Sequence, residues 1–189
     1  MIAPDHGPLW RRPEDIQRII SLWGKWAKQE PTRKIVIVYD TMWKSTAAMA
    51  HSIADGAMTK GVAVEVLTLS GTHRSDIATE VLTAGALVIG SPTLNGSMFP
   101  TVADTLCYIK GLRPVNLVGQ TFGSYGWGGE ATKEITEILT KMHVKLIGAP
   151  ITAKYVPDEA ELFKCRQLGE EIANYLIANI AVTHGVINL

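Results

Sequence analysis

The sequence has no excess charge of either sign and no long apolar run. Eighteen Lys and Arg residues balance eighteen Asp and Glu residues in a chain of 189. No net field would therefore draw the protein to nucleic acid or to an anionic membrane, and we expect neither as a partner. No apolar stretch reaches the roughly twenty residues that a membrane-spanning helix needs, and the first residues lack the pattern of a signal peptide. We therefore expect a cytoplasmic protein.

Cysteine is scarce, and the usual nucleotide-binding motifs are missing. The two cysteines, Cys107 and Cys165, form no Cys-x-x-Cys pair, which argues against a disulfide scaffold or a thiolate metal site. The sequence matches neither the Walker pattern nor the Gly-x-Gly-x-x-Gly fingerprint of dinucleotide-binding proteins. Any phosphate site must therefore be built in another way.

Short β-branched runs alternate with amphipathic stretches along the chain. A continuous apolar run such as Lys34–Tyr39 is typical of a strand that is covered on both faces. The five predicted strands are residues 34–39, 62–69, 86–90, 117–122 and 144–147, the last extending towards residue 152. Between them, apolar residues recur at helical spacing over residues 49–61, 75–82, 99–111, 131–142 and 162–176. This alternation predicts a flavodoxin-like, doubly wound parallel α/β sheet with strand order 2-1-3-4-5 and helices on both faces.

The ends of the chain stand outside this alternation. Residues 1–32 contain a predicted helix around Ile16–Trp23, with Pro13 near its start, and then a joint to the first strand. Residues 33–180 form the predicted α/β domain, and residues 181–189 form a tail without a clear pattern.

Hydroxyl-bearing residues follow the first predicted strand, where a helix begins. The segment Asp40-Thr41-Met42-Trp43-Lys44-Ser45-Thr46 offers three hydroxyls and several backbone N–H groups. Free N–H groups and the helix dipole both favour an anion at a helix N-terminus, so this segment could enclose a phosphate. A plain N-cap by Ser45 or Thr46 is the alternative interpretation.

Two further loops carry groups that suit a planar ring. Residues 91–100 form a polar loop after the third strand, with backbone donors and acceptors for the edge of a heterocycle, although Asn95-Gly96 is also an ordinary turn. After the fourth strand, residues 123–130 place Tyr125 and Trp127 among four glycines. An aromatic ring in such a loop can stack on a flat ligand.

These three loops converge, because ligands of open parallel sheets bind at the carboxyl ends of the strands, where the strand order reverses. One loop suits a phosphate and two suit a planar ring. Together they indicate a mononucleotide with a large heterocycle, which FMN fits best.

The same residues resemble a known family. The runs 39–46, 90–95 with 98–100, and 123–130 are similar to the flavodoxin domain of flavodiiron proteins, and the likeness covers nearly the whole chain. In that family a metallo-β-lactamase-like domain with two irons comes first, and its end resembles residues 3–10 here. By this resemblance the chain is the C-terminal part of a longer enzyme, and His6 matches the last histidine ligand of a di-iron centre whose other ligands are absent here.

The resemblance also implies site residues. The phosphate would be held by Thr41, Met42, Trp43, Ser45 and Thr46. The ring and ribityl chain would be held by Pro92, Thr93, Leu94, Asn95 and Gly96 on one side and by Ser124, Tyr125, Gly126, Trp127 and Gly128 on the other. Lys44 occupies a position where flavodoxins commonly have glycine.

The function implied by the resemblance is electron relay. In the family, FMN takes electrons from rubredoxin or from a reduced nicotinamide or deazaflavin system and passes them to the di-iron site, which reduces dioxygen, nitric oxide or both. Family members form head-to-tail homodimers, and the part present here would be only an electron carrier. A self-contained NAD(P)H or quinone reductase of the flavodoxin superfamily is the alternative. A phosphoryl-accepting receiver domain is disfavoured, because Asp40 has no acidic neighbour and Ser91-Pro92 replaces the acceptor Asp.

Overall fold

The computed structural model describes residues 1–181, which divide after residue 30 into two compact units. In the first unit, Ile2 and Trp10 form an antiparallel bridge ahead of helix α1 (Pro13–Lys28). Proline in the first turn and the acidic Glu14 and Asp15 favour the start of this helix, since all three suit an N-terminus with unpaired N–H groups. The predicted tail, residues 181–189, lies outside the described residues except for its first member.

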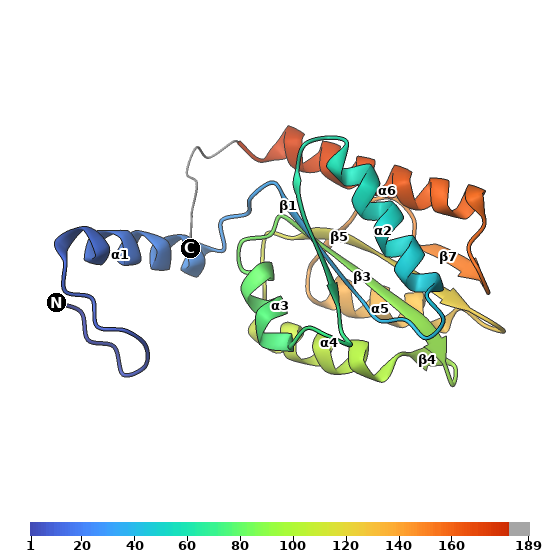
Figure 1. Cartoon of the computed structure of the whole chain (residues 1–189), viewed down its shortest axis with the longest axis horizontal. Coiled ribbons are helices and arrows are strands. Elements are labelled where there is room, and N and C mark those ends of the chain that lie inside the picture. Colours follow the sequence, from blue (N-terminus) through green and yellow to red (C-terminus); the bar gives the residue numbers. More distant parts are fainter. Residues whose placement is uncertain (182–189) are drawn as a thin grey trace. The chain divides into compact units, whose positions relative to one another are not determined.

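The second unit contains a parallel sheet of strand order β2-β1-β3-β5-β6 (Figure 1). Its strands are β1 (Lys34–Tyr39), β2 (Ala63–Thr68), β3 (Ala86–Leu94), β5 (Val118–Tyr125) and β6 (Lys145–Leu146). Two short strands lie off this path: β4 (Ser97–Met98) pairs antiparallel with β3, and β7 (Ile151–Lys154) pairs parallel with β5. The predicted doubly wound sheet and its strand order are therefore confirmed.

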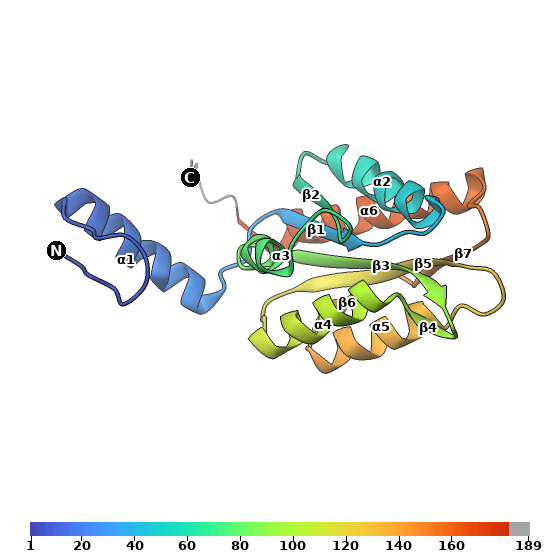
Figure 2. The ribbon, with the colours of Figure 1, turned by 60° about the horizontal axis from the view of Figure 1, so that its bottom comes forward.

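Helices cover both faces of this sheet (Figure 2). On one face, α2 (Ser45–Met58) and α6 (Glu159–Asn179) enclose a core that includes Ile35, Ile37 and Phe122. On the other face, α3 (Arg74–Val81), α4 (Pro100–Leu112) and α5 (Glu130–Lys141) enclose the strand side chains that point to that face. Successive residues of a strand point to opposite faces, so a strand buried on both faces must be apolar, as β1 is after its first residue, Lys34.

Three predicted strands differ from the structure by more than one residue at an end. Strand β3 continues to Leu94 instead of ending at residue 90, because Ser91 and Pro92 pair with Gly123 and Ser124 of the equally extended β5. The predicted fifth strand is divided into β6 and β7, since Pro150 has no N–H to donate to a ladder. Residues predicted as loops at the end of β3 and β5 are thus held in the sheet.

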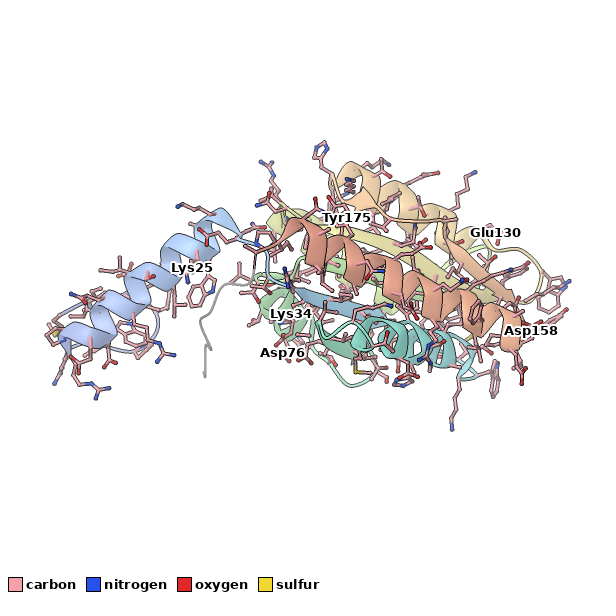
Figure 3. All side chains as sticks on the ribbon, turned by 90° about the horizontal axis from the view of Figure 1, so that it is seen from above. Lys25, Lys34, Asp76, Glu130, Asp158 and Tyr175 are labelled. Carbon is pink, nitrogen blue, oxygen red and sulfur yellow. The ribbon has the colours of Figure 1, made fainter. Side chains whose placement is uncertain are left out.

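The helices that follow these strands begin at the carboxyl ends of the strands. Glu130, the first residue of α5, and Asp158, which caps the N-terminus of α6, lie at the same end of the unit (Figure 3). This is the end at which the ligand site of an open parallel sheet is expected. None of the helices within residues 1–181 is long and apolar enough to cross a membrane.

Candidate functional site

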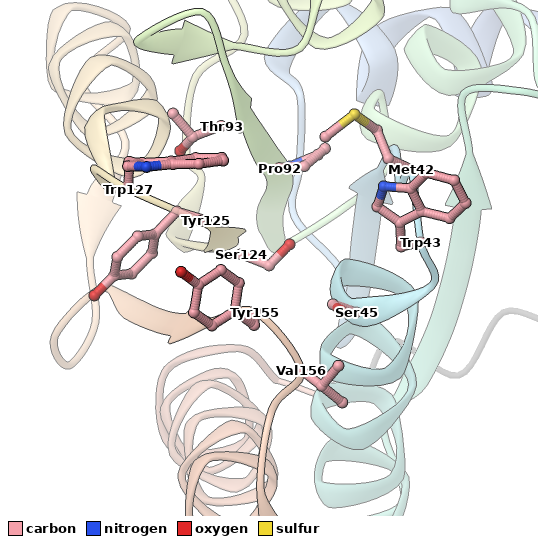
Figure 4. Close-up of a pocket in the computed structure, with 11 residues that line it drawn as sticks. Met42, Trp43, Ser45, Pro92, Thr93, Ser124, Tyr125, Trp127, Tyr155 and Val156 are labelled. Atoms are coloured by element: carbon pink, nitrogen blue, oxygen red, sulfur yellow. The ribbon is translucent and has the colours of Figure 1, made fainter.

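A cavity of about 390 Å³ opens at the carboxyl ends of the central strands (Figure 4). Four segments line it: the β1–α2 connection, the end of β3, the end of β5 with the loop that follows, and the β7–α6 connection. Strand β1 has β2 on one side and β3 on the other, so the cavity lies at the point where the strand order reverses. Its lining residues are Met42, Trp43, Ser45, Pro92, Thr93, Ser124, Tyr125, Gly126, Trp127, Tyr155 and Val156.

The N-terminus of helix α2 forms one end of the cavity. Ser45 is the first helical residue and lines the cavity, and Lys44 before it has a left-handed backbone with φ 68°. This conformation is the one that glycine adopts without strain, which accounts for the glycine that flavodoxins commonly have at this position. Behind Ser45, the buried hydroxyls of Thr46 and Ser124 are 2.9 Å apart and hydrogen-bonded, which ties α2 to β5. The first turn of α2 is thus held firmly beside the cavity.

The hydroxyl of Thr41 lacks a partner in a buried position. Among the buried side-chain oxygen and nitrogen atoms of residues 1–181, Thr41 Oγ1 alone makes no hydrogen bond. The backbone N–H of the same residue donates to Asp40 Oδ1 at 2.7 Å, and Asp40 Oδ2 accepts from the hydroxyl of Thr101 on α4. Burying a polar group without a partner is unfavourable, so an orphaned hydroxyl in this loop indicates a ligand atom.

Two tryptophans stand on opposite sides of the cavity, with Ser124 between them (Figure 4). The exposed fractions are 87% for Trp43 and 94% for Trp127, although tryptophan has a large hydrophobic side chain. Tyr155 adds a third exposed ring at the rim. Exposed apolar surface around a cavity is typical of a binding site, and flat rings suit a flat heterocycle.

The end of β3 is part of a hairpin with β4. Leu94 pairs with Ser97, and the two residues between them, Asn95 and Gly96, have φ angles of 53° and 72°. Positive φ at both central residues defines a type I′ turn, for which Asn-Gly is the preferred sequence. The interpretation of Asn95-Gly96 as a turn is therefore correct, and the turn forms the tip of a hairpin whose base lines the cavity.

The structure brings most of the predicted site residues together. Nine of them line the cavity, namely Met42, Trp43, Ser45, Pro92, Thr93, Ser124, Tyr125, Gly126 and Trp127. The others lie in the same segments but not on the cavity lining: Thr41 and Thr46 in and after the β1–α2 connection, Leu94, Asn95 and Gly96 in the hairpin, and Gly128 after Trp127.

Sequence reasoning missed the fourth segment of the site. Tyr155 and Val156 follow β7 and are 61% and 76% exposed. The predicted last strand ends near residue 152, so the prediction contains no loop that begins at Tyr155. An aromatic and a valine directly after a strand, before Pro157, were the signal that could have found them.

The predicted iron ligand has no companion ligands within the described part of the chain. His6 lies in the exposed segment ahead of α1. No group of three or more His, Cys, Asp or Glu side chains within residues 1–181 could hold a metal ion. One histidine cannot form a metal centre, since structural and catalytic sites need several converging ligands.

Comparison with known proteins shows the family to which the chain belongs. The sequence pattern of the family described as Flavodoxin matches residues 37–169. The nitric oxide reductase of Moorella thermoacetica is 44% identical over 173 residues, which are 91% of this chain and 43% of that protein.

Two solved structures extend the comparison. The rubredoxin oxygen:oxidoreductase from Desulfovibrio gigas has a TM-score of 0.91 at 40% identity, over 95% of this chain and 45% of that one. The flavodiiron protein from Giardia intestinalis has a TM-score of 0.82 at 27% identity, over 88% of this chain and 42% of that one. The chain thus spans less than half the length of each of these relatives.

Proposed function

Because this chain belongs to the flavodoxin family and corresponds to the flavodoxin-like part of flavodiiron proteins, we propose that it binds one FMN in the cavity and relays electrons through it. The single observation that carries this proposal is the composition of the cavity. The N-terminus of α2 lies at one end, and two exposed tryptophans flank the remainder. The orphaned hydroxyl of Thr41 belongs to the same β1–α2 connection, next to Met42 of the lining.

The β1–α2 connection fits the phosphate. Thr41, Ser45 and Thr46 supply hydroxyls, and the backbone of residues 42–46 supplies N–H groups at the start of α2. The orphaned Thr41 hydroxyl would gain its missing partner from a phosphate oxygen, and the helix dipole would stabilise the negative charge. Binding at this end requires no lysine or arginine, because N–H and O–H donors can satisfy a phosphate by themselves.

The strand ends and the glycine loop fit the ring. Pro92, Thr93 and the hairpin tip at residues 94–96 would hold one side of the ring and the ribityl chain, and residues 124–128 would close the other side. Trp43 and Trp127 would cover the ring faces and exclude water from them. Bound FMN supplies reversible one- and two-electron chemistry, while the protein supplies position and electrostatic environment. No side chain of this unit needs to act as an acid, a base or a nucleophile.

The relay has two ends that lie outside this chain. We propose that the full-length protein takes electrons from a donor such as rubredoxin, or a reduced nicotinamide or deazaflavin system, and delivers them to a di-iron site that reduces dioxygen, nitric oxide or both. His6 would contribute one ligand to that site, and a head-to-tail homodimer would bring the flavin of one protomer to the irons of the other. Both cysteines are free thiols, which suits the reducing cytoplasm that we propose as the location.

The proposal is tested by electron transfer under anaerobic conditions. We expect reduced rubredoxin to bleach the flavin absorbance band of the FMN-loaded chain. In separate assays with dioxygen or nitric oxide, the chain by itself should reduce neither at an enzymatic rate. Rapid reduction of a quinone by NADH or NADPH would instead support the alternative, a self-contained reductase. A chain that accepts electrons from none of these donors would contradict the relay.

A further inference from the structure

We propose that Glu134 is a positioning residue that holds together the two loops on either side of the flavin ring, an inference that rests on the proposed FMN site. Oε2 of Glu134 accepts a hydrogen bond from Ser97 Oγ at 2.7 Å and another from the backbone N–H of Met98 at 2.9 Å. Both donors belong to β4, the returning strand of the hairpin. Glu134 itself belongs to α5, which begins directly after the loop of Trp127. One carboxylate therefore connects the β3–β4 hairpin with α5, the helix that follows the loop of Trp127.

The hairpin needs this support because its own pairing is minimal. Strand β4 has only two residues, which pair with Thr93 and Leu94. Two short strands without further contacts are at best marginally stable in water. The Asn95-Gly96 tip is exposed, so side chains at its base must fix its position.

Two side chains fix three successive residues of the returning segment. Glu134 accepts from Ser97 and Met98, and Ser91 Oγ accepts from the backbone N–H of Phe99 at 2.8 Å. Ser91 lies within β3 itself, so Glu134 is the member of this set that comes from another element.

The path from Glu134 to the cavity is short. Met98, which donates to Glu134, pairs directly with Thr93, and Thr93 lines the cavity. In the other direction, α5 leads back through its first residue to Gly128 and Trp127. Loss of the carboxylate would remove both hydrogen bonds between the hairpin and α5 and change the spacing of the two ring-contacting segments.

The chemistry of the contact allows its parts to be separated. Hydrogen bonds to a carboxylate are shorter and stronger than those between neutral groups. Both bonds end on the same oxygen, so the single amide oxygen of a glutamine can accept both. Glu134→Gln thus removes the charge and keeps the acceptor, whereas Glu134→Ala removes both. Glu137, one turn later on α5 and exposed, provides the matched control.

The experiment measures FMN affinity by quenching of flavin fluorescence, at a temperature where circular dichroism shows every apoprotein folded. We expect Glu134→Ala to weaken binding roughly tenfold, which equals about 1.4 kcal/mol, and to alter the shape of the visible absorbance band of bound FMN. Glu134→Gln, which keeps weaker hydrogen bonds to a neutral acceptor, should bind FMN more tightly than Glu134→Ala, and Glu137→Ala should leave both properties unchanged. Ser97→Ala, which leaves α5 intact, should weaken binding less than Glu134→Ala and add little to it in the double variant.

Two results would overturn the inference. The first is wild-type affinity in Glu134→Ala. The second is a Glu134→Gln variant as weak as Glu134→Ala, because charge rather than the hydrogen bonds would then matter. If Glu134→Ala does not fold, wild-type affinity in Ser97→Ala is sufficient to refute it. A wild-type chain that binds no FMN would contradict the proposed function instead, so the two failures are distinguishable.

Discussion

Replacing Thr41 with valine should stabilise the apoprotein and weaken FMN binding at the same time. Valine keeps the shape of threonine and removes the hydroxyl, which is buried without a partner among the described residues. A buried polar group without a hydrogen bond costs about 1–3 kcal/mol. A gain of about 2 kcal/mol in a domain of this size would raise the apoprotein's Tm by roughly 4–8 °C. The lost hydrogen bond to a charged phosphate should weaken FMN binding by about 1.5–3 kcal/mol, a factor of roughly 10 to 150.

Thr46→Val should change the stability of the apoprotein in the opposite direction. Thr46 Oγ1 is hydrogen-bonded to Ser124 Oγ at 2.9 Å, and both residues are buried. The valine variant leaves the Ser124 hydroxyl unpaired, so the apoprotein should lose about 1–3 kcal/mol of unfolding free energy. Urea denaturation of the apoproteins and titration with FMN check both variants. A Thr41→Val apoprotein that is less stable than wild type, or that binds FMN equally well, would refute the reasoning.

Three further predictions concern the cavity, the thiols and the packing of α2 against α6. Trp127→Ala should weaken FMN binding by roughly 1–3 kcal/mol through lost stacking and leave the unfolding free energy unchanged, since Trp127 is 94% exposed. Cys107 is exposed and should react with a thiol reagent at pH 8, whereas Cys165 should react only on unfolding, because burial, aided by the charge of Glu161, raises its pKa to about 12. Gly169→Ala should destabilise the fold by about 1–3 kcal/mol or more, because the new Cβ would lie 2.0 Å from the Ile53 carbonyl oxygen.

Each of these predictions has its own control and its own contrary result. Phe163→Ala, exposed on α6 but off the cavity lining, should not change FMN affinity, and an equal loss there would remove Trp127 from the site. Two thiols that react in the folded protein at pH 8 would contradict the burial of Cys165. Gly24→Ala, with open space around its Cβ position, should not destabilise the protein, and a Gly169→Ala variant as stable as this control would disprove the close helix contact.

The raised pKa of Cys165 also implies a dependence of stability on pH. The thiol has a usual pKa of 9.0 in the unfolded chain and a pKa of about 12 when folded. Below pH 9 the thiol is protonated in both states, so its contribution to stability is fully present. Between pH 9 and pH 12 only the unfolded chain loses the proton, and the free energy of unfolding should fall across this window. Cys165→Ala should show a smaller fall over the same range.

The fold and three of the four cavity segments could be predicted because local pattern and general topology agree. Continuous apolar strands alternate with amphipathic helices, which requires a parallel sheet, and a parallel sheet places the connections after β1, β3 and β5 at one edge. Hydroxyls before a helix, and aromatics among glycines, then have a specific chemical meaning at that edge.

The remaining features depend on contacts that sequence spacing does not reveal. Pro92 has no N–H to donate and is typical of a loop, yet pairing with Ser124 keeps it in the sheet. Tyr155 has a left-handed backbone with φ 64°, which is unusual for an aromatic residue. Its N–H donates to the carbonyl oxygen of Tyr125 at 2.7 Å, and this long-range bond places the ring at the cavity.

The most direct test of the account is a titration of the purified apoprotein with FMN, followed by the quenching of flavin fluorescence. We predict a single saturable transition that ends at one FMN per chain. Riboflavin, which lacks the phosphate, should bind far more weakly, because the β1–α2 connection then has no anion to hold. No saturable binding of FMN, or equal affinity for FMN and riboflavin, would contradict the assignment of this cavity.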